Sequence, residues 1–456
     1  MSGFTVCGTV IHAPVCGEVE VLEDALIEVD ETGHIVAVHL AGTDDYQELR
    51  RRASERGKLQ LLAAGQYLLP GLVDLHIHAP QWPQLGKALH LPLYGWLHQY
   101  TFPLEAKYRD IGFAEAVYTS LVDTLVANGT TTALYFGTIH LEATKRLADI
   151  CLARGQRGLV GKVAMDNPEE CPDFYRDVSA ERGLEDTRAL IQYINALSGN
   201  ETGLVKPVVT PRFIPSCTDE MLAGLAEIAG EYGCHIQTHC SESDWEHAYV
   251  INRHGRHDGQ SLKEFGLLTN KTLLAHANFI DDADMDAIGQ AQTGIAHCPL
   301  SNFYFSNAVF PARKALDRGL QVGLGTDISG GPDPSLLRNC SMAVTTSRAL
   351  EEGVDPDADS DSRGTPGSRI DFREAFWMAT TAGGLALDLK TGLFKQGYAF
   401  DAIVIDANVE NSNLILWEGL DTHEDMLQKI IYSADRHNII RVWVQGRLIK
   451  GDNNAC

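Results

Sequence analysis

The chain has 456 residues, of which 44% are hydrophobic and 21% charged, a composition typical of a globular protein with one to three domains. Its 61 acidic residues outnumber its 37 basic residues and give a formal net charge of −24. This excess argues against nucleic acid or an anionic membrane surface as a partner, because phosphate groups are bound by clustered cations. A neutral small molecule is the favoured ligand.

The start of the chain and its cysteines both favour a cytosolic protein. Residues 1–10, MSGFTVCGTV, lack the basic start and the long apolar run of a signal peptide. No segment of about 18 apolar residues predicts a membrane span. The ten cysteines are scattered without regular spacing, so we expect reduced thiols rather than a disulfide framework.

Short strand-like segments mark both ends of the chain. Near the N-terminus these are FTVCGTVI and ALIEVDETGHIVAV, and the second contains a Thr-Gly turn between two strands. Near the C-terminus they are DAIVIDA and the hairpin NIIRVWVQGRLIKG, which has glycine at its turn. We therefore expect one small β-sandwich domain that residues 1–69 and residues 386–456 build together.

Between these ends, residues 70–385 alternate short apolar segments with amphipathic helical segments. The apolar segments are YLLPGLVDLHIH, TTALYFGT, GLVGKVAMDN, VKPVVTPRF, CHIQTHCSE, TLLAHAN, GIAHCPLSN and QVGLGTDIS. Eight strands that alternate with helices predict an α/β fold, the (β/α)8 TIM barrel. An open doubly wound sheet is the alternative, and the absence of a GxGxxG motif after the first strand disfavours it.

Two further local signals belong to this middle region. Three helical segments, FAEAVYTSLVDTLVANG, EDTRALIQYINALSG and DEMLAGLAEIAGEYG, end in glycine, which is favoured just after a helix. Residues 351–368, EEGVDPDADSDSRGTPGS, are acidic and interrupt the alternation, so we expect them to form a solvated loop without a chemical role.

The carboxyl ends of barrel strands are where catalytic groups lie. His76 and His78 end the first strand two residues apart, so their side chains face the same way, roughly 6–7 Å apart along the backbone. A lone HxH pair is more often ordinary, but together with His239 and Asp327 it predicts a metal site. Imidazole and carboxylate ligands suit Zn²⁺, with Fe²⁺ or Mn²⁺ as alternatives.

Three other residues at strand ends have both a catalytic and an ordinary interpretation. Glu242 is placed to shuttle protons, as a deaminase requires, although a glutamate at a helix start is common. His276 is placed to orient a water molecule, with a core histidine as the alternative. Arg212 carries only donors and suits a substrate edge with a carbonyl oxygen and a ring-nitrogen acceptor, unless it pairs with a neighbouring carboxylate. Some related two-metal sites use a lysine at the end of the fourth strand. Here that end reads TPRF, which favours one metal ion over two.

Several motifs extend this interpretation. In their order and spacing, PGLVDLHIHAPQ, TPRFIPSC, THCSES, AHCPLSNFYFSN and GLGTDISGGPDPSLL resemble those of the amidohydrolase superfamily, and the resemblance covers nearly the full chain. The HxH pair marks only the superfamily. APQ directly after it, together with PRFIPSC, is more specific and is similar to the members that deaminate a purine base.

The resemblance implies particular roles for the residues at the strand ends. It implies one Zn²⁺ held by His76, His78, His239 and Asp327. It implies a purine pocket lined by Gln81, Trp82, Arg212, Phe213 and Glu242. Catalysis would then fall to Glu242, His276 and Asp327.

The activity that the resemblance implies is the hydrolytic deamination of guanine to xanthine and ammonia, by a cytosolic homodimer active in purine catabolism. A deaminase of the cytosine, triazine or adenosine type is the alternative within the superfamily. A barrel without catalytic activity is disfavoured, because every expected metal-ligand position is filled.

Overall fold

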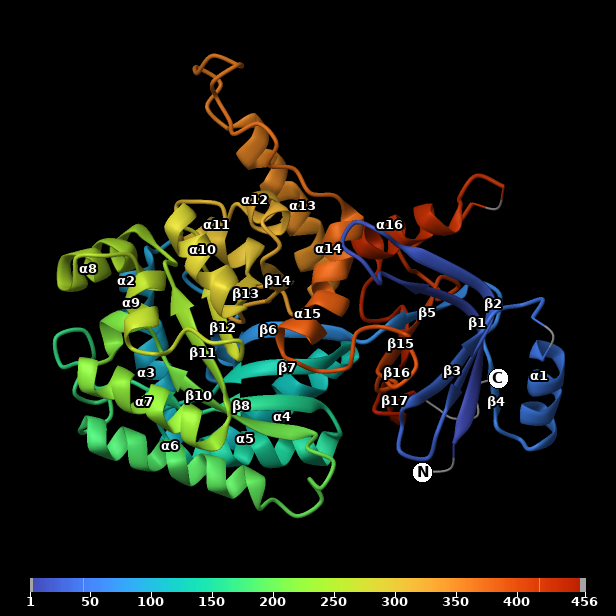
Figure 1. Ribbon diagram of the computed structural model, residues 1–456, viewed down its shortest axis with the longest axis horizontal. Helices are drawn as coiled ribbons and strands as arrows, with labels where there is room; N and C mark the ends of the chain where they lie inside the picture. Colours follow the sequence, from blue (N-terminus) through green and yellow to red (C-terminus); the bar gives the residue numbers. More distant parts are fainter. Residues whose placement is uncertain (1–2, 44, 418, 452–456) are drawn as a thin grey trace.

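The computed structural model describes residues 3–43, 45–417 and 419–451. Its centre is a barrel of eight parallel strands, which confirms the predicted (β/α)8 fold (Figure 1). Two backbone hydrogen bonds join the ends of the first and last strands, from Asp327 N to His76 O and from His78 N to Ile328 O, both 2.8 Å long. The strands, in spatial order, are β6 (Leu72–His78), β7 (Thr130–Phe136), β8 (Arg157–Gly161), β10 (Val205–Pro211), β11 (His235–Cys240), β12 (Thr272–His276), β13 (Gly294–His297) and β14 (Gln321–Leu324).

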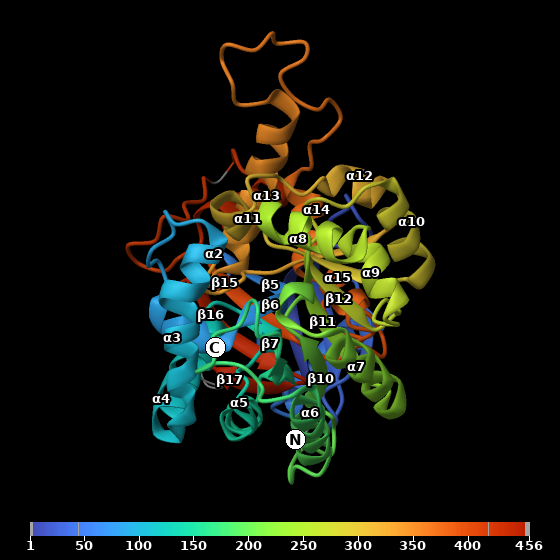
Figure 2. The same cartoon turned by 90° about the vertical axis from the view of Figure 1, so that its left-hand side faces the viewer.

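Helices surround the barrel on its outer face (Figure 2). Gly233 follows α7 (Asp219–Tyr232) with φ of +63°, a conformation in which a side chain would be strained, so it caps that helix as its sequence predicts. The helices that follow the barrel strands are α4 (Ile111–Ala127), α5 (Leu141–Arg154), α6 (Ala180–Asn195), α7 (Asp219–Tyr232), α8 (Asp244–His254), α9 (Asp258–Glu264), α10 (Asp282–Ala291), α11 (Pro299–Phe305), α12 (Ala312–Asp317), α13 (Leu336–Glu352), α14 (Phe372–Ala379) and α15 (Thr381–Ala386).

The connection between β6 and α4 is built from short helical turns. It runs through the 3₁₀ turn η1 (Ala79–Gln84), α2 (Leu93–Trp96), the π-helical turn η2 (Leu97–Thr101), α3 (Phe102–Glu105) and the 3₁₀ turn η3 (Ala106–Arg109). Leu93, Trp96, Leu97 and Phe102 are buried in one hydrophobic cluster with Phe136 of β7 and Phe213. This connection therefore covers the carboxyl ends of the first strands.

Both ends of the chain contribute to one further sheet of eight strands. Its order is β17-β16-β15-β5-β1-β2-β3, and β4 pairs with β1. The predicted β-sandwich thus takes the form of a single mixed sheet, beside which α1 (Tyr46–Glu55) and α16 (His423–Ser433) lie (Figure 1). Its strands are β1 (Phe4–His12), β2 (Glu20–Val29), β3 (Ile35–His39), β4 (Leu59–Leu61), β5 (Gln66–Pro70), β15 (Ala402–Asp406), β16 (Ile439–Val444) and β17 (Arg447–Lys450).

The barrel interior is apolar towards the amino-terminal ends of its strands. A buried cluster fills it with Val73, Leu75, Leu134, Leu159, Val208, Leu273 and Ala296. In β6, two residues, Leu75 and His76, lie opposite the single residue Leu134 of β7, because the register shifts between Asp74 and Ile77. This β-bulge lets Leu75 join the interior cluster while His76 lies just above it.

Residues 353–368 project away from the barrel, and most of them are exposed, as expected for this acidic segment (Figure 2). The first two residues of the predicted loop, Glu351 and Glu352, instead end α13. Within the described residues, no helix combines the length and the apolar character that a membrane crossing requires.

Candidate active site

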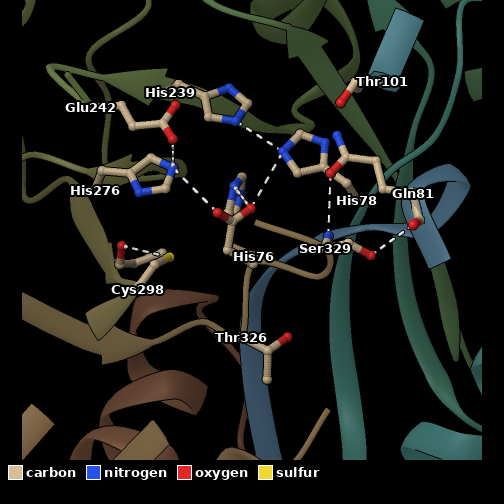
Figure 3. Close-up of polar contacts among 12 residues, drawn as sticks. His76, His78, Gln81, Thr101, His239, Glu242, His276, Cys298, Thr326 and Ser329 are labelled. Carbon is tan, nitrogen blue, oxygen red and sulfur yellow. Dashed lines mark hydrogen bonds and ion pairs between the residues drawn. The ribbon is translucent and has the colours of Figure 1, made fainter. Parts of the chain in front are cut away.

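The carboxyl ends of β6, β11, β12 and β14 bring four histidines and two carboxylates together inside the barrel (Figure 3). His76 Nε2 lies 3.2 Å from Asp327 Oδ1, and His78 Nε2 lies 3.6 Å from the same oxygen. Their imidazole rings are 4.9 Å apart between centroids. The pair thus converges on one point, as the i, i+2 spacing predicts.

His239 faces this pair from β11. Its Nδ1 donates to the backbone oxygen of Arg212 at 2.6 Å, since a carbonyl oxygen only accepts. Its Nε2 therefore carries a lone pair, and that atom lies 2.9 Å from His78 Nε2. Nitrogen ligand atoms of His76, His78 and His239 all lie within 4.8 Å of one another.

This donor set fits a metal ion. His76 Nε2 is buried and, among the described residues, makes no hydrogen bond, although Asp327 Oδ1 lies 3.2 Å away. Burial lowers the pKa values of His76, His78 and His239 well below their ordinary range, so all three imidazoles are neutral near pH 7. Three neutral imidazoles beside one carboxylate are a ligand set that suits Zn²⁺ or Fe²⁺.

A chain of amide groups sets the tautomer of His276. The carbonyl oxygen of Glu242 accepts from Asn278 Nδ2 at 3.0 Å, so the other side of that amide, Oδ1, faces Asn302 Nδ2 at 2.7 Å. Asn302 Oδ1 then faces His276 Nδ1 at 2.9 Å, which makes this nitrogen the protonated one. His276 Nε2 is left 3.7 Å from Glu242 Oε1 and 4.0 Å from Asp327 Oδ2.

The two carboxylates of the site are both buried. Burial, and then the charge of Asp327, raises the pKa of Glu242 well above its ordinary value. Burial also raises the pKa of Asp327. Glu242 is therefore suited to carry a proton at neutral pH, which is the property of a general acid.

Several of these residues have unusual backbone conformations. His276, Ala277 and Asp327 have φ between +49° and +71°, and Ser241, directly before Glu242, has φ of +49°. Positive φ is uncommon outside glycine and clusters at functional sites, where it turns a side chain away from the regular strand direction. The chain thus departs from β geometry at or just after the ends of β11, β12 and β14, at the positions that form the site.

A small cavity opens onto this cluster. It contains Gln81, Arg212, Phe213 and Glu242, four of the five residues expected to line a substrate pocket. Arg212 is also fully buried and ion-paired, with Nη1 2.7 Å from Glu105 Oε2. The residues that line the cavity are His78, Gln81, Leu93, Trp96, Leu97, Arg212, Phe213, His239, Glu242, Phe305, Asp327 and Gly330.

Comparisons with known proteins agree with this geometry. The family model described as the amidohydrolase family matches residues 67–449. The chain belongs to the amidohydrolase family. It is 38% identical to a guanine deaminase of Dictyostelium discoideum, over 97% of both chains, and 34% identical to that of Homo sapiens, over 97% of this chain and 95% of that one. A guanine deaminase of C. acetobutylicum, solved with bound guanine in its active site, superposes with a TM-score of 0.87 at 31% identity, over 98% of this chain and 100% of that one.

One predicted pocket residue of this amidohydrolase lies elsewhere. In the turn η1, Gln81 is directed to the cavity, but Trp82 packs towards α4, where its Nε1 donates to Ser120 Oγ at 3.1 Å. Trp82 instead lines a separate surface hollow with Thr124 and Arg338. The resemblance implied that both Gln81 and Trp82 line the pocket, but consecutive residues of a 3₁₀ turn point in different directions.

Other residues of this site were not predicted. Leu93, Trp96 and Leu97 reach the cavity from the connection between β6 and α4, whose sequence has no regular pattern. Asn302 lies in the motif AHCPLSNFYFSN, but only the fold shows that it contacts His276. Glu105 gives no signal at all, because a single glutamate in FPLE is an ordinary helix residue by sequence.

Proposed function

We propose that this amidohydrolase is a zinc-dependent guanine deaminase, which converts guanine and water to xanthine and ammonia. The observation that carries the proposal is the single cavity that joins the histidine and aspartate cluster to Glu242, Arg212 and Gln81. Full-length similarity to guanine deaminases from several organisms supports the choice of substrate.

The proposed metal ligands are His76, His78, His239 and Asp327. Second-sphere contacts support them, because His239 donates its other ring nitrogen to a carbonyl oxygen, as metal-binding histidines commonly do. Zn²⁺ held there would supply a hydroxide nucleophile near neutral pH by lowering the pKa of its water to about 7. One ion per chain is proposed, with Fe²⁺ as the alternative.

The protein side chains would move the protons. His276 keeps its Nδ1 proton on Asn302, so its Nε2 is the acceptor that orients the attacking water together with Asp327. Asp327 and His276 would take up the first proton of the water as its oxygen bonds to C2, and protonated Glu242 would give its own proton to ring N3. Glu242 would then accept the remaining hydroxyl proton, which leaves a carbonyl at C2, and pass that proton to the amino group. The bond between C2 and that nitrogen breaks, and ammonia leaves.

Substrate recognition would depend on donors and aromatic contact. Arg212 offers only N–H donors, which match O6 and N7 on one edge of guanine. Adenine has an amino donor at position 6 and would place donor against donor. Phe213, buried at the cavity wall, supplies an apolar surface for the ring, and Gln81 offers both a donor and an acceptor to another edge.

The experiment that tests this proposal follows the ultraviolet absorbance of guanine with the purified protein, alongside elemental analysis for metal. We expect conversion to xanthine, about one zinc per chain, and loss of the rate when the metal is chelated. Metal without guanine turnover would contradict the substrate assignment. A panel of cytosine, triazine and adenosine substrates would then identify the reaction.

The cellular setting belongs to the same proposal. We place the enzyme in the cytosol, as a homodimer that acts on free purine base in purine catabolism. The nine cysteines among the described residues are free thiols, which suits a reducing compartment.

A further inference from the structure

A buried carboxylate, Glu105, lies behind the two side chains proposed to recognise the purine edges. It ends α3, and its exposed fraction is 0%. An ionised carboxylate is tolerated in such a place only when several donors surround it. The donors around Glu105 therefore indicate the purpose of its charge.

Arg212 is the first of these donors. Its Nη1 lies 2.7 Å from Glu105 Oε2 and its Nη2 lies 3.2 Å from Glu105 Oε1, a bidentate pair. Phe102, on the same short helix, packs against the guanidinium, whose Cζ is 5.1 Å from the ring centroid. The carboxylate fixes the plane of the guanidinium and the ring covers one of its faces, so its remaining N–H donors have one direction in the cavity.

Gln81 is the second donor. Its Nε2 donates to Glu105 Oε1 at 3.1 Å. Its Oε1 accepts from the backbone N–H of Ser329 at 3.2 Å, as Figure 3 shows. A carboxylate only accepts and a backbone N–H only donates, so the orientation of the amide is determined. The second Nε2 hydrogen and the second Oε1 lone pair remain for a ligand.

We infer that Glu105 is a positioning residue that sets the specificity of the pocket, by holding Arg212 and Gln81 in a pattern of donors and acceptors that matches the oxygen-bearing edges of guanine. This inference rests on the proposed function. Glu105 Oε1 receives both Arg212 Nη2 and Gln81 Nε2, so one atom couples the two groups that recognise the base. Loss of that acceptor atom would remove one contact from each group and leave Arg212 with Glu105 Oε2 and Gln81 with the N–H of Ser329.

The test replaces Glu105 by glutamine, which keeps the shape of the side chain but removes its charge and one acceptor. We expect the KM for guanine to rise roughly 10- to 100-fold in Glu105→Gln, because hydrogen bonds to charged groups are lost, with kcat falling less. Zinc content should stay at about one per chain. The comparison substrate is 2-aminopurine, which keeps the C2 amino group but lacks O6. The ratio of kcat/KM for guanine to kcat/KM for 2-aminopurine should fall by a similar factor.

A matched control separates positioning from general stability. Asp401, which precedes β15, is a buried carboxylate that pairs with Arg157 at the far end of the barrel and also accepts from Thr391. Asp401→Asn should lower the unfolding temperature while the KM and the preference for guanine stay unchanged. Equal effects of the two variants on KM, or an unchanged KM in Glu105→Gln, would overturn the inference.

A second variant covers the case in which Glu105→Gln does not fold. Glu105→Asp keeps the charge but is one methylene shorter, so it cannot hold both partners at their present distances. We expect a several-fold rise in KM, and a wild-type KM would overturn the inference. Wild-type protein without guanine turnover would instead refute the proposed function, which the same assay measures first.

Discussion

The Nε2 atoms of His78 and His239 face each other at 2.9 Å, although the two residues are 161 positions apart in the chain. His239 Nε2 carries a lone pair, so this contact is either a hydrogen bond from the Nε2–H tautomer of neutral His78 or two lone pairs that face a bound cation. The second arrangement is the one that the proposed metal site requires, and it leads to the first prediction.

His76→Ala should lose metal and activity together. Removing one of four ligands leaves an incomplete site, so we expect zinc to fall from about one per chain to near zero. Turnover should fall at least about 10³-fold, because the metal contributes several kcal/mol to catalysis. Mass spectrometry of metal content and the guanine assay check this. His437→Ala, at an exposed histidine, is the control and should change neither quantity.

Glu242→Gln should keep the metal and lose turnover. The amide has nearly the same shape but cannot exchange a proton between water, ring and leaving group, so we expect kcat to fall about 10²- to 10⁴-fold. Zinc content and the affinity for the product xanthine are measured on the same sample. Near-normal turnover in this variant would rule out the proton-shuttle role.

Asn302→Ala should affect turnover through the tautomer of His276. Without the amide oxygen, His276 Nδ1 has no fixed acceptor, and we expect a loss of roughly 10- to 100-fold in kcat, as for other second-sphere contacts. The pH profile of kcat should also change, which a purely structural role would not cause. Asn339→Ala, at a buried asparagine of α13, is the matched control. A pH profile identical to that of wild type in Asn302→Ala would contradict this prediction.

His235 should make the stability of the protein sensitive to acid. Burial lowers its pKa to about 4, from an ordinary value of 6.5, while its Nε2 donates to Leu387 O at the bottom of the barrel. The folded state therefore binds a proton more weakly than the unfolded state. The contribution of neutral His235 to the free energy of unfolding is complete above pH 6.5. It is lost as the pH falls towards 4, and the loss is at most about 3 kcal/mol.

Urea unfolding of wild type and His235→Asn at pH 7.5, 5.5 and 4.5 measures the contribution of His235 to the free energy of unfolding. The free energy of unfolding should fall more steeply with acid in wild type than in the variant. Parallel slopes in the two proteins would show that His235 does not titrate in this range.

Much of the fold follows from local patterns in the chain. The alternation of eight apolar segments with helices predicts the barrel, because strand and helix periods differ and each segment shows its own. The strand-end histidines follow from the same logic, since parallel strands of a barrel end at one face. The direction of His76 and His78 follows from the two-residue repeat of a strand.

Contacts between distant segments were decided only by the tertiary structure. The β-bulge at Leu75 and His76 depends on pairing with β7, which the sequence of β6 does not encode. Trp82 was predicted to line the pocket together with Gln81, yet it packs towards α4.

The sequence by itself thus determined which strands form the barrel and which side chains stand at their ends, since both are set by residues close together in the chain. Only the fold decided that Glu105 meets Arg212, 107 residues later, and that Asn302 meets His276. The physical reason is that a buried charge or amide is stable only with specific partners, and those partners come from elements that local patterns cannot pair.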